Sequence, residues 1–133
     1  MKITRVEHVG IVVKDIGEAL PFYSALGLKS GPTEDLPDAG LKIAFLPVGE
    51  SSLELLQPTR EDNSQGRFLK ENGEGIHHLC LRVEGIDEAI KELVEVGYQM
   101  VDQTPRSVFG GKARVAFVHP RSTHGVRLEL WEE

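Results

Sequence analysis

The sequence contains a single cysteine, Cys80, among its 133 residues, so no disulfide bond can form within the chain. A lone cysteine suits the reducing cytosol, where such bonds are rare. No apolar run approaches the roughly 18 residues that a membrane-spanning helix needs. The first residues read as a strand and not as a signal peptide. These absences predict a cytoplasmic protein with no membrane partner.

Basic and aromatic residues are also scarce. Lys and Arg total 15 against 21 Asp and Glu, a net charge of −6, which argues against a nucleic-acid partner. Aromatic residues make up 6% of the chain, which is little for a protein that sequesters a drug-like ligand in a stacking groove. A metal-free binding protein of that kind remains an alternative. Hydrophobic residues reach 40%, enough for the core of one compact domain.

An internal repeat is the main feature of the sequence. Residues 8–13 recur 70 positions later as residues 78–83, and the match continues without a gap to Gly27 and Gly97. Each copy predicts an alternating strand, then a helix, over about residues 16–26 and 86–96. Each helix ends at a glycine suited to a left-handed cap. The repeat resumes in strand-like segments, since residues 42–46 resemble 114–118 and residues 53–55 resemble 128–130.

The repeat predicts an α+β fold of two βαβββ modules about a pseudo-twofold axis. Module one spans about residues 1–57 and module two about 75–133, joined by a linker of about 58–74 within one domain, 1–133. We expect a short helix over 64–71 in the linker and a strand over 98–102 in module two. The aromatic pair Phe22 and Tyr23 on the first helix is expected in the core.

Each module carries a histidine on its first strand and a glutamate on its last. These are His8 and Glu54, then His78 and Glu129, at matching positions of the repeat. A single strand histidine is seldom a ligand, but four such residues at matched positions would converge if they point inward. Two imidazoles and two carboxylates suit a borderline divalent ion such as Co²⁺, Ni²⁺, Zn²⁺ or Mn²⁺. His77 must point to the opposite face from His78, so we expect it to have a structural role.

Several segments resemble the vicinal oxygen chelate superfamily, which includes glyoxalase I, bleomycin-resistance proteins and the methylmalonyl-CoA epimerases. The His77–His78 doublet and residues 119–126 look most like the epimerases, as do residues 7–11, 45–49 and 110–112. The resemblance implies a curved mixed sheet around a metal site, with His8, Glu54, His78 and Glu129 as ligands.

The resemblance also implies an isomerase that inverts carbon 2 of methylmalonyl-CoA, or of a similar acyl-CoA, through a metal-stabilised enolate. The cofactor would be a divalent ion, with Co preferred and Ni, Mn or Zn possible. Glu129 is the first candidate for the base. Some epimerases place a second glutamate on the strand that corresponds to residues 41–46, where this chain has Lys42 and Ile43. The second acid/base group is therefore open, with Lys42 or a ligand water as options.

A polyanionic CoA tail needs local cations, and Lys112, Arg114 and Arg121 form the best group near a glycine-rich loop. An alternative enzyme is a glyoxalase-I-like lyase that acts on a thiol adduct of an α-oxoaldehyde with the same four ligands. A ring-cleaving dioxygenase is disfavoured because it typically uses two histidines and one carboxylate, and Glu54 would be a fourth ligand. Open sheet edges also predict a homodimer.

Overall fold

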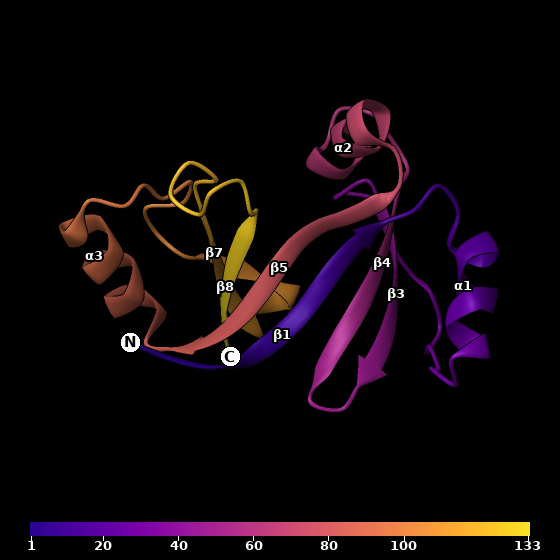
Figure 1. The fold of residues 1–133 in the computed structure, drawn as a ribbon, viewed down its shortest axis with the longest axis horizontal. Coiled ribbons are helices and arrows are strands. Elements are labelled where there is room, and N and C mark those ends of the chain that lie inside the picture. Colours follow the sequence, from indigo (N-terminus) through magenta and orange to yellow (C-terminus); the bar gives the residue numbers. More distant parts are fainter. The chain divides into compact units, whose positions relative to one another are not determined.

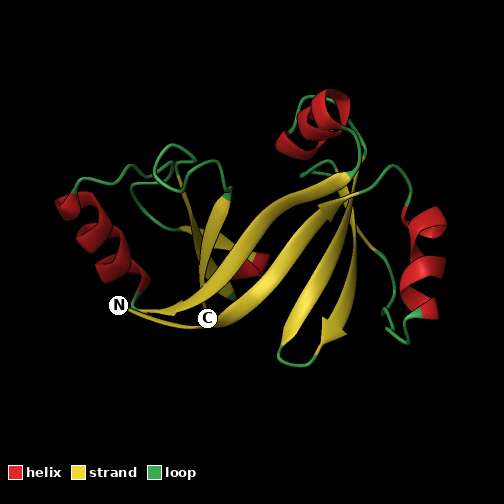
Figure 2. Cartoon of the chain, viewed as in Figure 1, coloured by secondary structure: helices red, strands yellow, loops and turns green.

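The computed structural model describes all 133 residues as a mixed α and β fold (Figures 1 and 2). None of its helices combines the length and the apolar character needed to cross a membrane. In chain order the elements are β1 (Lys2–Val12), α1 (Ile16–Ala25), β2 (Glu34–Leu36), β3 (Leu41–Val48), β4 (Ser51–Pro58), α2 (Ser64–Asn72), β5 (Gly75–Glu84), α3 (Ile86–Val96), β6 (Arg106–Val108), the 3-10 helix η1 (Phe109–Gly111), β7 (Ala113–Val118) and β8 (Leu128–Glu132).

Both predicted βαβββ modules are present, and their strands pair in the same way. In the first, β1 is parallel to β4, β4 is antiparallel to β3, and β3 is antiparallel to β2. In the second, β5 is parallel to β8, β8 is antiparallel to β7, and β7 is antiparallel to β6. Counted from the edge strand inward, the order is β2–β3–β4–β1 in the first module and β6–β7–β8–β5 in the second. The two orders are equivalent, which confirms the fold class.

The chain packs as two compact units, each with its own core. The His8 unit comprises residues 8–77, and the His78 unit comprises residues 1–7 and 78–133. The long strands β1 and β5 each begin in one unit and end in the other. The residues predicted as a linker, 58–74, belong to the His8 unit and contain α2, close to the predicted helix.

Side chains of the His8 unit alternate between two apolar layers, as strand geometry requires. Ile16 and Tyr23 of α1 pack on one face of the sheet against Ala44 and Leu55, and Figure 1 shows α1 beside β3 and β4. The opposite face carries Val12, Leu41, Ile43 and Leu56, with Phe45 of β3 and with Phe68 and Leu69 of α2 packed against them.

The His78 unit has the same two-layer arrangement. Helix α3 packs on one face through Ile86, Ala89 and Ile90, which contact Ala116 and Leu130 of the sheet. The opposite face carries a second cluster made of Cys80, Ala113, Val115 and Trp131, with Val108 packed against it. The face that bears Cys80 thus corresponds to the face that bears Val12 in the His8 unit.

Side chains and glycines cap the helix ends, and the glycine at the end of α3 was predicted. The Asp15 side chain accepts a hydrogen bond of 3.3 Å from the Glu18 backbone N–H, as an N-cap does. Gly97 closes α3 with φ of 106°, a left-handed conformation that favours glycine. The α3 start has no cap of its own, so Glu132 of β8 accepts bonds of 2.9 and 2.8 Å from the Gly85 and Ile86 N–H groups.

Two expectations about local structure are wrong. Residues 98–102 form no strand beyond an isolated bridge from Met100 to Val118. The Asp102 side chain, not the backbone, accepts the Phe117 N–H at 2.8 Å, and the edge strand forms later as β6. Phe22 is 64% exposed, because the face of α1 that packs on the sheet carries Ile16, Ala19 and Tyr23. Tyr23 does lie against the core.

The substitution Glu132→Gln removes the carboxylate that caps the start of α3. It should lower the free energy of unfolding by about 1 to 2 kcal/mol. The hydrogen bond from the Ile86 N–H and the contact with Arg114 hold the pKa of Glu132 below its ordinary value, against the effect of burial. This contribution is full above the pKa of the unfolded chain and is lost as pH falls through the lower folded pKa. Urea unfolding of both proteins should therefore show a difference at neutral pH that shrinks in acid. An equal difference at every pH would contradict the assignment.

Candidate metal centre

In the His8 unit, one histidine and one glutamate form a buried pair. His8 on β1 is 3% exposed, and its Nδ1 lies 2.9 Å from Glu54 Oε2 on β4. The parallel register places Glu54 opposite Gly10, two residues beyond His8 on the same face. Gly10 has no side chain, so it places no group beside Glu54. On its other side Glu54 faces Phe45 of β3.

The His78 unit builds the equivalent pair from β5 and β8. His78 and Glu129 are 7% and 8% exposed, and His78 Nε2 lies 3.5 Å from Glu129 Oε1. Glu129 stands opposite Cys80 on β5 and opposite Phe117 on β7. The Phe117 ring meets the His78 ring edge to face at 6.0 Å. The two units thus place their histidine and glutamate at identical register positions.

The chemistry of these pairs fits a divalent ion. Two ligand atoms that each bind an ion at about 2.1 Å lie roughly 3.0 to 3.4 Å apart at octahedral to tetrahedral angles. The separations of 2.9 and 3.5 Å lie about 0.1 Å outside the two ends of that range. Burial of a carboxylate also costs free energy unless a positive charge compensates it. Imidazole and carboxylate donors together suit Co²⁺, Ni²⁺, Mn²⁺ or Zn²⁺.

Cys80 breaks the symmetry between the units, since it occupies the repeat position of Gly10. Its side chain is fully buried, and its sulfur lies within 4.8 Å of a Glu129 carboxylate oxygen. The sequence repeat showed that the two residues correspond but gave no reason to single out the thiol. A thiol at this place is a further potential donor in the His78 unit.

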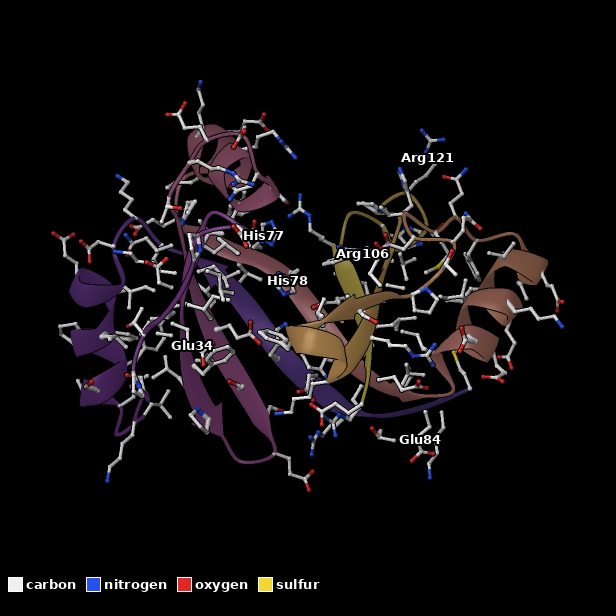
Figure 3. The ribbon with its side chains drawn as sticks, turned by 180° about the vertical axis from the view of Figure 1, so that it is seen from behind. Glu34, His77, His78, Glu84, Arg106 and Arg121 are labelled. Atoms are coloured by element: carbon white, nitrogen blue, oxygen red, sulfur yellow. The ribbon has the colours of Figure 1, made fainter.

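His77, the other member of the histidine doublet, has structural contacts (Figure 3). It is 5% exposed, and its Nε2 lies 3.0 Å from the Ser64 hydroxyl at the start of α2. Its ring meets Phe68 of the same helix at 5.3 Å. These contacts hold α2 against the beginning of β5 and agree with the expected structural role.

The three predicted cations are not gathered at one place. Arg114 points to the α3 face of its sheet, where it bonds Glu132 and lies 2.9 Å from Asp87. The hydrogen bond to Glu132 raises the pKa of Arg114 most, and the hydrogen bond to Asp87 raises it further. Lys112 and Arg121 are exposed in loops, as Figure 3 shows for Arg121.

Arg106 on β6 is a cation that sequence reasoning missed. Its Nε donates to Asp102 Oδ1 at 3.1 Å, and its guanidinium lies over the Phe117 ring at 5.9 Å from the centroid. Since Arg106 pairs with Val115 and Phe117 pairs with Glu129, Arg106 lies on the same face as Glu129. The pairing of β6 with β7 shows which face Arg106 occupies. No repeated motif marks Arg106 in the sequence.

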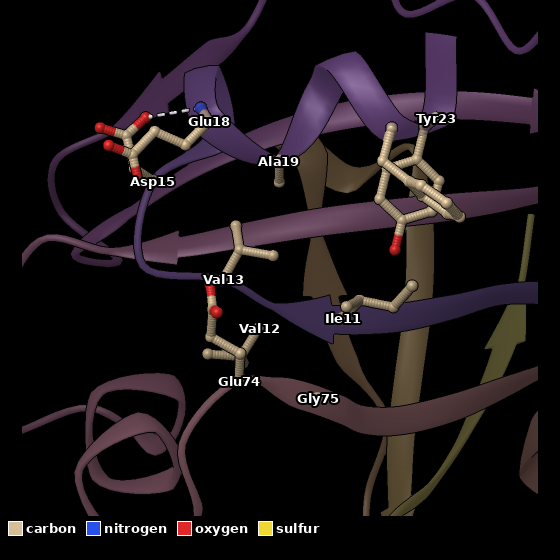
Figure 4. A pocket seen from close by; sticks show the side chains of 10 residues that line it. Ile11, Val12, Val13, Asp15, Glu18, Ala19, Tyr23, Glu74 and Gly75 are labelled. Carbon is tan, nitrogen blue, oxygen red and sulfur yellow. Dashed lines mark hydrogen bonds between the residues drawn. The ribbon is translucent and has the colours of Figure 1, made fainter. Parts of the chain in front are cut away.

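A separate cavity of about 480 Å³ lies between α1 and the adjoining ends of β1 and β5 (Figure 4). Two of its three carboxylates already bond the backbone: Asp15 caps α1, and Glu74 accepts the Lys14 N–H at 2.9 Å. Neither His8 nor Glu54 lines it. The cavity is therefore distinct from the buried pair.

The chain is similar to proteins named as methylmalonyl-CoA epimerases. An ethylmalonyl-CoA/methylmalonyl-CoA epimerase of Cereibacter sphaeroides is 34% identical over 130 residues, 96% of this chain and 97% of that protein. A solved structure of a methylmalonyl-CoA epimerase with methylmalonyl-CoA and NH4+ superposes with a TM-score of 0.88 at 34% identity, over 99% of this chain and 96% of that one.

A solved structure of a hypothetical protein from Bacillus halodurans gives a TM-score of 0.90 at 46% identity, over 97% of this chain and 94% of that one. Residues 7–117 match the family described as the Glyoxalase/Bleomycin resistance protein/Dioxygenase superfamily. That match includes three of the four residues in the buried pairs. The chain therefore belongs to the glyoxalase/bleomycin resistance protein/dioxygenase superfamily.

Proposed function

We propose that this protein is a metal-dependent isomerase that inverts carbon 2 of methylmalonyl-CoA or of a similar acyl-CoA. The observation that carries the proposal is the match, over nearly the whole of both chains, to an enzyme named for this reaction. The solved epimerase with methylmalonyl-CoA supports an acyl-CoA as substrate. A cytoplasmic location and a homodimer stay predictions.

In this proposal His8, Glu54, His78 and Glu129 hold one divalent ion, with Co preferred and Ni, Mn or Zn as alternatives. Such an ion, when bound, supplies positive charge that stabilises an enolate. The separations within each pair and the mixed imidazole and carboxylate donors support this assignment. Carbon 2 lies between a thioester carbonyl and a carboxylate. The thioester carbonyl makes the C–H bond of carbon 2 more acidic.

Glu129 is the proposed base for one face of carbon 2. Its carboxylate would take the proton as the C–H bond breaks, and the electron pair would pass into the enolate. Lys42 is a poor choice for the second group, because it lies on the opposite face of β3 from Phe45, the residue beside Glu54. Its cross-strand partners are Asp35 and Gln57.

Arg106 supports an anionic substrate. It shares a face with Glu129, and its ion pair with Asp102 and its position over Phe117 fix the guanidinium there. A guanidinium fork matches a carboxylate or a phosphate with two parallel hydrogen bonds. We assign Arg106 to the substrate carboxylate, while contact of Lys112 and Arg121 with the phosphates of the CoA tail stays a prediction from the sequence.

The proposed reaction predicts deuterium uptake at carbon 2. Cobalt-loaded protein incubated with (2R)- or (2S)-methylmalonyl-CoA in D₂O should convert each epimer to the other and lose the C2 proton signal in NMR. A chelator-stripped sample should do neither. If the metal stays bound and no exchange occurs, the glyoxalase-I-like lyase becomes the better reading, with thiol adducts of α-oxoaldehydes as the next substrates.

Arg106→Gln should raise KM for methylmalonyl-CoA about 10-fold or more, because one charge-assisted hydrogen bond contributes about 1.5 to 3 kcal/mol. We expect kcat to change less, since the guanidinium binds the substrate in every state. Steady-state kinetics of the variant provides the measurement. Arg60→Gln, which removes another exposed arginine paired with an aspartate at 2.8 Å, is the matched control. Equal KM values for both variants would contradict the role of Arg106.

A further inference from the structure

We infer that Glu34, on the short edge strand β2 of the His8 unit, is the second acid/base group that the proposed reaction needs besides Glu129. This inference rests on the proposed epimerase reaction and deepens it. Nothing in the sequence pattern marks Glu34, because it lies outside the repeated segments. Figure 3 labels this residue on its edge strand.

Inversion at carbon 2 sets the requirement. One carboxylate takes the proton as the C–H bond breaks, and the electron pair enters the enolate. A carboxylic acid on the opposite face then returns a proton to carbon 2 as the enolate collapses. No oxidant or further reactant is needed, because one carboxyl group gains the proton that the other loses. Reaction in the reverse direction or exchange with water restores the starting state.

The strand register of the His8 unit places Glu34 on the face of the buried pair. Glu34 stands opposite Ile43 on β3, and Ile43 lies two residues from Phe45, which stands opposite Glu54. Residues directly opposite, or two apart on one strand, project from the same face. Glu34 and Glu54 therefore share a face, whereas Asp35 next to Glu34 points to the other one.

The spacing suits a small acyl group. Two strand separations and two residue rises put the Cα atoms of Glu34 and Glu54 roughly 12 Å apart. Each glutamate side chain extends about 4 to 5 Å, so side chains that turn toward each other by about 3 Å each leave roughly 6 Å between the two carboxylates. A carbon atom in contact with a carboxylate oxygen on each side needs about 6 to 7 Å, so a small acyl group fits there and would touch the Glu34 carboxylate directly.

The surroundings leave the Glu34 carboxylate available for proton transfer. Its neighbours on this face are the apolar side chains of Ile43 and Phe45, with Leu36 beyond it on β2. No hydrogen bond or ion pair of the structure engages the Glu34 side chain, which is exposed. The paired segments of β1 to β4 bring four polar side chains to this face. They are those of His8, Ser52, Glu54 and Glu34.

The equivalent position in the other module carries the opposite charge. Ile43 corresponds to Val115 in the repeat, and the residue that pairs with Val115 is Arg106. The two edge strands therefore present a glutamate in one unit and an arginine in the other. A duplicated scaffold with an acid on one edge and a cation on the other has the groups for proton transfer and for anion binding.

The test compares proton exchange from each epimer separately in Glu34→Gln. In D₂O the variant should epimerise at least about 100-fold more slowly, the usual effect of a lost acid/base group. The epimer whose proton faces Glu129 should still exchange deuterium with retention of configuration, and the other epimer should not. Glu129→Gln should lack exchange of both epimers, because Glu129 is also a proposed metal ligand. Asp35→Asn, a charge removal on the neighbouring residue and opposite face, should behave as wild type.

Two results would overturn this role. One is wild-type epimerisation by Glu34→Gln. The other is equal loss of exchange from both epimers, which would mean that Glu34 supports the site as a whole and does not serve one face. Failure of the proposed function is distinguishable, because the wild-type protein itself would then epimerise neither substrate.

Discussion

Burial of a carboxylate beside an imidazole requires a compensating positive charge, and this chain builds that situation twice. His8 and Glu54 form one pair, and His78 and Glu129 form the other, each within its own unit. Burial of these carboxylates would be unfavourable in a protein that only needed a stable core. Apolar residues at the same register positions would pack as well. The divalent ion that we propose accounts for a histidine and a glutamate at the same positions of both units.

The two copies of the repeat differ at positions that the proposed reaction uses. Both units use the same strand pairing to present their histidine and glutamate, and the proposed metal site depends on these shared positions. The differences lie beside each pair, where Gly10 of one copy corresponds to Cys80 of the other, and on the edge strands, where Glu34 corresponds to Arg106. In the proposed reaction, the acid on one edge strand and the guanidinium on the other have two different roles toward one substrate.

Sequence patterns predicted the features that depend on local periodicity. The repeat located the modules, the alternation of β1 separated His8 and Val12 from Ile11 and Val13, and glycines marked the helix ends. The pairing partners of the short strands could not be predicted from the sequence. Strands β2 and β6 have three residues each, which is too few to show an alternating pattern. The positions of Glu34 and Arg106, on which their proposed roles rest, are therefore visible only in the strand register.

Side-chain contacts between residues that are distant in the sequence were also not predictable from it. Asp102 takes a backbone N–H that a strand would otherwise bond, so the expected strand over 98–102 does not form. Arg114 was expected near the substrate, but the carboxylates of Glu132 and Asp87 hold it on the α3 face. Such contacts join residues 15 to 27 positions apart in the sequence, where no local pattern reports them.

The most direct test of the shared metal site is the cobalt K-edge X-ray absorption spectrum of the loaded protein, with one ion per chain. The account predicts two imidazole nitrogens and carboxylate oxygens around cobalt, one imidazole fewer in His78→Ala, and an unchanged spectrum in His77→Ala. A single imidazole in the wild-type protein, or a sulfur neighbour at about 2.3 Å from Cys80, would contradict the proposed ligand set.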